Sequence, residues 1–260
     1  MSSSTRAGRD HLLRVVDALL AVTLAPTCAA CAQALERPTD GPVCARCWAA
    51  VARLTPPLCR TCGGMLPSWR AIDEAMERCA PCRRRASAID AGRTAGDYEG
   101  ALREIVHAFK YDGRRILASR LGELMREAGR DLLADASCVV PVPLHPWRRF
   151  RRGFNQAADL AGALNLPVVH ALWRTRATAP QTGLAASARR RNVRGAFALS
   201  PLVSRRSRGA MLVDRVIVLV DDVRTTGATL EACATVLKDA GAREVRALTA
   251  ARAAPPAALE

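Results

Sequence analysis

One segment, Val216 to Leu230 with the sequence VIVLVDDVRTTGATL, constrains the fold of this chain most. Its first five residues are apolar and mostly β-branched, which predicts a short parallel strand buried on both faces. Asp221 and Asp222 follow at the C-terminal end of that strand, where open α/β sheets bind their ligands. A helix is predicted next, from about Gly227 to Ala240. The segment therefore predicts a strand, loop and helix that belong to a ligand-binding α/β domain.

The predicted loop and helix have the donors that a phosphate group needs. A helix N-terminus carries free N–H groups and roughly half a unit of positive charge. The hydroxyls of Thr225, Thr226 and Thr229 add donors, and Gly227 lets the backbone approach a ligand closely. Two carboxylates beside this site can accept hydrogen bonds from a vicinal diol. A phosphate and a diol together describe a ribose 5-phosphate, whereas a plain helix cap needs only one acid.

The cysteines predict a second, metal-binding module. Four cysteines can hold one zinc ion in a tetrahedral site, and Cys-X-X-Cys loops direct two thiolates at one ion. Eight of the ten cysteines precede residue 83, so we expect two zinc ions. The intervening lengths suit two consecutive ribbons, but the spacing alone leaves interleaved and nested pairings open. The four pairs are Cys28 with Cys31, Cys44 with Cys47, Cys59 with Cys62, and Cys79 with Cys82.

Two other interpretations of the cysteines are weaker. A secreted disulfide framework would need residues 15–26 to act as a leader, but Asp17 interrupts this apolar run. Redox Cys-X-X-Cys motifs rarely occur four at a time. We therefore expect an amphipathic helix that leads into the first ribbon, and no stretch apolar enough to span a membrane. Cys138 and Cys233 fall in strand and helix patterns and are predicted to be core residues.

The remaining pattern completes an α/β domain. Prolines in the segment from Pro141 to Pro146 predict a rigid loop at the C-terminal edge of the sheet. Residues 174–194 have little apolar periodicity, which predicts a mobile binding loop or lid. We expect a helix at 1–27, a double zinc ribbon at 28–85, the α/β domain at 86–250 and a flexible tail at 251–260. Strands are predicted at about 93–98, 136–142, 167–173 and 245–250, and helices at about 99–110, 116–133 and 156–164.

Several motifs together resemble the ComF family, which includes competence proteins and gluconate-utilisation relatives. They are the paired Cys-X-X-Cys ribbons, FKYDGRR from Phe109, VPVPLH from Val140, RRFRRGFNQA from Arg148, QTGL from Gln181 with RRNVRGAF from Arg190, and VDDVRTTGAT from Val220. They occur in a consistent order along most of the chain. One departure is Arg224, where the relatives commonly carry an aromatic or aliphatic residue.

The resemblance implies a type I phosphoribosyltransferase fold, a mostly parallel sheet with flanking helices, behind a double zinc ribbon. The implied ligand is phosphoribosyl pyrophosphate with Mg²⁺, and Asp221 and Asp222 are the implied catalytic residues that position the ribose hydroxyls. Closure of the arginine-rich loop would exclude water and offset charge on the departing pyrophosphate. The other implied binding residues are Val223, Arg224, Thr225, Thr226, Gly227, Ala228, Thr229, Pro143, Leu144 and His145.

The charge of the chain favours a phosphate-rich partner. The formal net charge is +15, and it falls to +11 because each four-thiolate zinc site carries −2. Aromatic residues are only 4% of the chain, so contacts to phosphates would dominate over base stacking. The residues expected to bind nucleic acid or pyrophosphate are Arg148, Arg149, Arg151, Arg152, Asn155, Gln156, Arg190, Arg191 and Arg194.

Two functions are compatible with these features. The first is a cytoplasmic phosphoribosyltransferase with an unknown acceptor, which acts in DNA uptake and competence or in nucleotide metabolism. The second is a non-catalytic accessory protein of natural transformation, which binds single-stranded DNA and DNA-uptake proteins and uses the same fold as a platform. The sequence contains no recognisable pocket for an acceptor base that would separate them.

Overall fold

The computed structural model describes residues 3–67, 77–144, 153–176, 195–203 and 210–253, which fold into two compact units. The first unit contains Met1–Ala52 and Glu99–Leu117, and the second contains Arg53–Tyr98 and Ala118–Glu260. The boundary at residue 52 falls between the second and third Cys-X-X-Cys pairs. Each unit therefore contains four of the eight paired cysteines.

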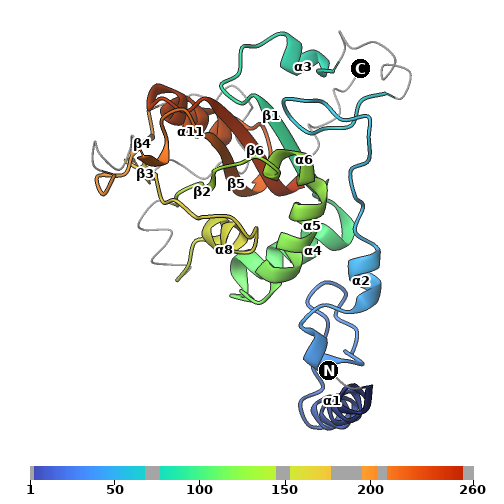
Figure 1. The fold of residues 1–260 in the computed structure, drawn as a ribbon. Coiled ribbons are helices and arrows are strands. Elements are labelled where there is room, and N and C mark those ends of the chain that lie inside the picture. The colour runs from blue at the N-terminus through green and yellow to red at the C-terminus, as the bar shows by residue number, and fades with distance from the viewer. Residues whose placement is uncertain (1–2, 68–76, 145–152, 177–194, 204–209, 254–260) are drawn as a thin grey trace. The chain divides into compact units, whose positions relative to one another are not determined.

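The second unit is built on a four-stranded parallel sheet in the order β1-β6-β5-β2 (Figure 1). The strands are β1 (Ala91–Asp97), β2 (Cys138–Pro141), β5 (Val216–Arg224) and β6 (Glu244–Arg252). The two central strands, β5 and β6, each contain a continuous buried stretch, and in β5 this stretch is the apolar run from Val216 to Val220. The α/β class with a mostly parallel sheet is confirmed.

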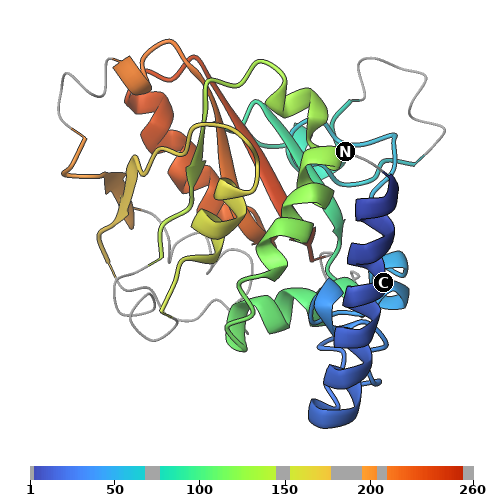
Figure 2. The same cartoon turned by 60° about the horizontal axis from the view of Figure 1, so that its bottom comes forward.

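Helices cover both faces of this sheet. Because strand side chains alternate, Ile217 and Leu219 of β5 share one face, and they pack with the buried side of α11 (Ala228–Asp239). Figures 1 and 2 show α5 (Leu117–Ala128) and α8 (Gln156–Gly162) on the side of the sheet opposite α11. Cys138 and Cys233 are buried in the core that includes α11, as predicted.

The helix predicted at 116–133 is split in two. α5 ends at Ala128, and α6 (Arg130–Leu133) follows after Gly129. A Cβ atom on Gly129 would lie 2.7 Å from Cδ1 of Leu248 in β6, so only glycine allows this approach to the sheet. Another four-residue helix of the same unit, α3 (Ala80–Arg83), begins directly after Cys79.

The strand predicted at 167–173 is only partly correct. Val168 makes a single parallel bridge to Val139, and the chain then leaves the main sheet. β3 (Leu172–Arg174) instead pairs antiparallel with β4 (Phe197–Leu199) in a separate two-stranded sheet. Most of the loop predicted at 174–194 lies outside the described residues.

The first unit contains α1 (Ser3–Leu24), η1 (Pro38–Asp40), α2 (Ala45–Ala49) and α4 (Gly100–Tyr111). The predicted N-terminal helix is present as α1. Asp17, which interrupts its apolar run, is buried, and its Oδ1 accepts a hydrogen bond of 2.9 Å from the backbone N–H of Thr39. This hydrogen bond therefore connects α1 to η1. In the part of the chain that the structure describes, no helix is both long and apolar enough to cross a membrane.

Candidate functional site

The end of β5 carries the two acids predicted to bind the ligand. β5 continues past Val220 to Arg224, because Asp221 pairs with Thr249 of β6 and Arg224 pairs with Arg252. The predicted end of the strand at Val220 was therefore four residues too early. The acids lie on paired backbone near the C-terminal edge of the sheet.

Asp221 and Asp222 point to opposite faces of the sheet. Strand alternation puts Asp221 on the face of Ile217 and Leu219, and Asp222 on the other. The backbone N–H of Asp222 donates to Oδ1 of Asp221 at 2.9 Å, which fixes the orientation of that carboxylate. A ligand that contacts both acids must therefore lie over the end of β5 and not on one face of the sheet.

Gly227 makes the turn between this strand end and α11. Its φ of 74° and ψ of 4° lie in the left-handed region, which glycine adopts at low cost. The backbone N–H of Glu231 donates to the carbonyl oxygen of Gly227 at 2.9 Å, which begins the helix. Thr226 Oγ1 accepts a hydrogen bond of 3.4 Å from the N–H of Ala228. The positive end of the α11 dipole is thus held beside Asp221 and Asp222, an arrangement suited to a phosphate.

The loop after β2 begins next to the same strand end. The backbone N–H of Val142 donates to the carbonyl oxygen of Val220 at 2.9 Å. Pro143 and Leu144 follow this contact and are half-buried. Eight predicted residues lie outside the described part of the chain, namely His145, Arg148, Arg149, Arg151, Arg152, Arg190, Arg191 and Arg194.

Asn155 and Gln156 are described, and both have positions within the fold. The side chain of Asn155 caps α8, since its Oδ1 accepts a hydrogen bond of 3.2 Å from the N–H of Ala157. Its Nδ2 donates to the carbonyl oxygen of Val142, also at 3.2 Å. Gln156 is only 1% exposed. Asn155 therefore connects α8 to the loop beside the candidate site.

The eight paired cysteines form two groups of four, which settles the pairing that the spacing left open. In each group the four Sγ atoms lie within 4.8 Å of one another. The pairing is consecutive. The first group is Cys28, Cys31, Cys44 and Cys47, and the second is Cys59, Cys62, Cys79 and Cys82.

The geometry of both groups fits a zinc ion. Zinc–sulfur bonds of about 2.3 Å in a tetrahedron place neighbouring sulfur atoms about 3.8 Å apart. The Sγ atoms of Cys28 and Cys47 are 3.8 Å apart, and those of Cys62 and Cys79 are 3.7 Å apart. Backbone N–H donors also favour the thiolate of Cys28. Burial alone would raise the pKa of the Cys28 thiol, but N–H donors from Cys44 and Ala30 lower it to about 6.

A cavity of about 650 Å³ opens beside the loop. Thr226, Gly227 and Ala228 line it at the start of α11, and Phe197 of β4 and Arg85 line it elsewhere. The sequence did not predict a role for Phe197 or Arg85. Phe197 ends the RRNVRGAF motif and Arg85 is the last residue of the predicted ribbon module, but neither position indicated a ligand-binding role.

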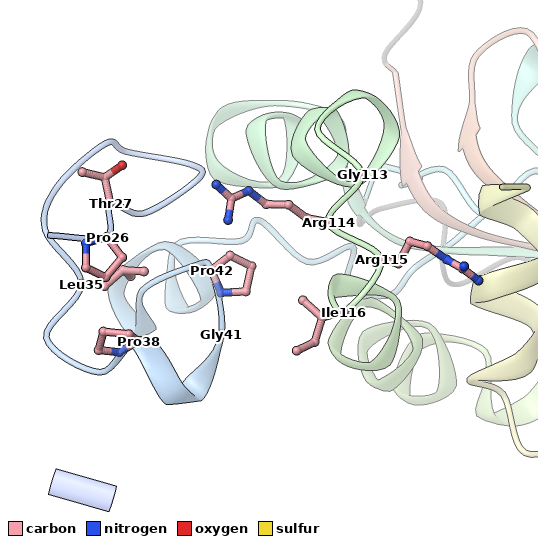
Figure 3. Close-up of a pocket in the computed structure, with 10 residues that line it drawn as sticks. All are labelled: Pro26, Thr27, Leu35, Pro38, Gly41, Pro42, Gly113, Arg114, Arg115 and Ile116. Carbon is pink, nitrogen blue, oxygen red and sulfur yellow. The ribbon is translucent and has the colours of Figure 1, made fainter. Parts of the chain in front are cut away.

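A second cavity, of about 560 Å³, lies within the first unit (Figure 3). The wall formed by the first zinc ribbon is largely apolar and includes Pro26, Leu35 and Pro42. Arg114 comes from the turn after α4, and Figure 3 shows its side chain pointing toward the ribbon. The cavity therefore combines an apolar wall with a cation.

Comparison with known proteins supports both modules. A phosphoribosyl transferase domain matches residues 151–258, and a double zinc ribbon domain matches residues 19–83. Competence protein F of Haemophilus influenzae is 31% identical over 207 residues, which cover 76% of this chain and 85% of that protein. DNA utilization protein YhgH of Escherichia coli O157:H7 is 34% identical over 209 residues, 75% of this chain and 84% of its own.

A more distant relative is competence protein ComFC of Streptococcus pneumoniae, which is 28% identical over 159 residues, 60% of this chain and 65% of that protein. With its double zinc ribbon, its phosphoribosyltransferase domain and these relatives, the chain belongs to the ComF family.

Proposed function

We propose that this protein binds phosphoribosyl pyrophosphate together with Mg²⁺ at the end of β5, and that it acts in the cytoplasmic handling of DNA during uptake or utilisation. The observation that supports the ligand best is the left-handed Gly227 between Asp222 and α11. It brings a helix N-terminus, two carboxylates and a hydroxyl-rich loop together at one edge of a parallel sheet.

Each part of the site matches one part of the ligand. The N-terminus of α11 and the hydroxyl of Thr226 would hold the 5-phosphate. Asp221 and Asp222 would orient the ribose hydroxyls from the strand end, and Pro143 and Leu144, in the loop after β2, would contact the pyrophosphate half. Carboxylate oxygens are ligands that Mg²⁺ accepts, and a bound ion would neutralise charge on the pyrophosphate.

The chemistry that such a site supports is nucleophilic displacement at C1′ of the ribose. The bond from C1′ to the pyrophosphate oxygen breaks, and its electron pair leaves with the pyrophosphate. A lone pair of the acceptor forms the new bond to C1′, and the acceptor loses its proton. The role of the chain is to hold the phosphate, the diol and the leaving group in line.

A second candidate function, binding of single-stranded DNA without catalysis, is favoured by the names of the relatives and by the first-unit cavity. A base could lie against Pro26 and Pro42, while Arg114 contacts a neighbouring phosphate. The two functions use different residues, so they can be tested separately.

Isothermal titration of the zinc-loaded protein with phosphoribosyl pyrophosphate, with and without Mg²⁺, tests the first function. We expect saturable binding that is stronger with Mg²⁺, and no comparable binding of ribose 5-phosphate alone. A protein that binds single-stranded DNA and shows no heat with phosphoribosyl pyrophosphate would favour the second function.

A further inference from the structure

The second cysteine group is attached directly to the sheet that carries the candidate ligand site. The backbone N–H of Gly92 in β1 donates to the carbonyl oxygen of Arg60 at 2.7 Å. A Cβ atom on Gly92 would lie 2.6 Å from the carbonyl oxygen of Thr61, and one on Gly63 would lie 2.9 Å from Cα of Arg93. The ribbon turn, residues 60–64, therefore lies with its backbone against the backbone of β1. Side chains larger than that of glycine would not fit at Gly63 or Gly92.

Arg252, the last residue of β6, reaches one of the metal-binding sulfur atoms. Its Nη1 donates to Sγ of Cys62 at 3.3 Å. A Cβ atom on Gly64 would lie 1.5 Å from the same Nη1, so the guanidinium lies directly over this glycine. A four-thiolate zinc site carries a net charge of −2, which the positive charge of Arg252 partly offsets.

Arg224 connects the same ribbon turn to the ligand loop. It is the strand partner of Arg252, and its Nη1 lies 3.4 Å from the carbonyl oxygen of Thr61. On its other side, a Cβ atom on Gly227 would lie 3.1 Å from Nε of Arg224. The Arg224 guanidinium is thus held between the ribbon and the residue that makes the phosphate turn.

The charges explain why this arrangement needs the cysteines. Burial lowers the pKa of the Arg224 guanidinium, the negative charge of Cys62 opposes that effect, and the neighbouring Arg252 adds to it. Arg224 and Arg252 are both half-buried, and two adjacent cations in such a place are favoured by nearby thiolates and repel each other without them. The thiolate cluster therefore favours the position in which Arg224 contacts Thr61 and Gly227.

We infer that Arg224 and Arg252 are positioning residues that couple the second zinc site to the ligand loop, so that zinc in Cys59, Cys62, Cys79 and Cys82 and ligand at Asp221–Thr229 stabilise each other. This inference rests on the proposed binding of phosphoribosyl pyrophosphate. Coupling between two sites is reciprocal: if zinc favours the loop conformation that binds the ligand, the ligand must favour retention of zinc.

The test follows the reactivity of individual cysteines in the full-length, zinc-loaded protein. A fixed excess of a zinc-selective chelator captures zinc that leaves the clusters, and N-ethylmaleimide then alkylates the freed thiols. Peptide mass mapping gives the rate of alkylation of each cysteine. Saturating phosphoribosyl pyrophosphate with Mg²⁺ is expected to slow alkylation of Cys62 and Cys79 by about fivefold or more, the lower end of typical couplings. Cys31 and Cys44 of the first cluster serve as the control in the same tube, and their rates should not change.

Variants separate coupling from simple loss of structure. Arg224→Leu keeps all eight cysteines, and we expect it to abolish the effect of ligand on Cys62 and Cys79. Arg224→Lys keeps the positive charge and should restore part of that effect. Arg46→Leu is the matched control: Arg46 interacts with Cys31 of the first cluster, so this change should alter alkylation only there and leave ligand affinity unchanged.

The outcomes distinguish this inference from the proposed function. If calorimetry shows ligand binding but Cys62 reacts at the same rate with and without ligand, the coupling is wrong and the proposed ligand stands. If Arg224→Leu keeps the full protection, Arg224 is not the connection. If wild-type protein shows no ligand binding by calorimetry, both the coupling and the proposed function are overturned.

Discussion

Asn155 donates a hydrogen bond of 3.2 Å to the carbonyl oxygen of Val142, and its Oδ1 caps α8. One side chain therefore holds both the helix and the loop that leads to Pro143. We predict that Asn155→Ala lowers the free energy of unfolding by about 1 kcal/mol, as the loss of a helix cap typically does. Urea unfolding monitored by circular dichroism measures this change.

Asn155→Asp provides the control for this prediction. Aspartate keeps the acceptor that caps α8 but loses the donor to Val142. It should therefore recover most of the stability lost in Asn155→Ala. An Asp variant as unstable as the Ala variant would show that the bond to Val142, and not the cap, is the important contact.

The double change Asp221→Asn with Asp222→Asn should abolish binding of phosphoribosyl pyrophosphate while the fold persists. The amides are almost isosteric with the acids, and the backbone pairing of Asp221 with Thr249 does not depend on side-chain charge. Calorimetry measures the affinity, and an unchanged melting temperature confirms the fold. Unchanged affinity in the folded variant would mean that the carboxylates are not part of the site.

The strand and loop around these acids could be predicted because the signal is local. An apolar run, two acids and a Thr/Gly turn lie within fifteen residues, and a helix follows immediately. β3 and β4 could not be predicted in the same way, because only three residue pairs join them and their partners are distant in sequence. Cysteine spacing likewise predicted two four-cysteine sites but not which pairs share one.

The contact between Arg224 and Thr61 was the least predictable feature of the site. The two residues are 163 positions apart, and the contact depends on the ribbon turn reaching β1. From the sequence, Arg224 was one of the implied ligand-binding residues and a departure from the family pattern, with no indication of a contact to the ribbon. The structure gives that departure a physical reason, since an arginine here can contact the ribbon beside the thiolates of the second cluster.

Metal analysis should give two zinc ions per chain in protein purified without chelator. Structural zinc contributes on the order of 10 kcal/mol to small metal-folded modules. Chelation should therefore unfold the ribbon around Cys28 and detach the turn around Cys62 from β1, while the apolar core around β5 persists. Fewer than one zinc per chain would contradict the assignment of both sites.

Asp135 should make stability depend on pH. Its Oδ2 accepts a hydrogen bond of 3.1 Å from Nη2 of Arg246, and this contact lowers the pKa of the Asp135 carboxyl. The folded pKa then lies below the unfolded value of about 3.9, so the contribution is present above that value. It is lost as the pH falls through the folded pKa.

Asp135→Asn should consequently destabilise the protein at pH 7 and not at low pH. Because the side chain of Asp135 is 61% exposed, we expect a cost of no more than about 1 kcal/mol. Urea unfolding of both proteins at several pH values measures the difference, and any loss of zinc in acid affects both alike. A difference that stays constant from pH 7 to acid would exclude this charge as its source.

Binding of single-stranded DNA should weaken steeply with salt if the arginine cluster contacts phosphates. Each neutralised phosphate contributes about 0.7 to the slope of log affinity against log salt concentration. Replacing Arg148, Arg149, Arg151 and Arg152 with alanine should therefore flatten the slope by up to roughly 3 units. Fluorescence anisotropy of a labelled oligonucleotide at several salt concentrations measures both slopes.

Arg114→Ala tests whether single-stranded DNA binds instead at the cavity of the first unit. It removes one cation from the cavity that Pro26 and Pro42 line, so it should change the slope by only about 0.7 if a phosphate binds there. If the salt slope changes in Arg114→Ala but not in the variant that lacks the four arginines, the DNA binds to the first unit. A slope that moves with neither would exclude both surfaces, and absence of any binding at low salt would leave phosphoribosyl transfer as the remaining function.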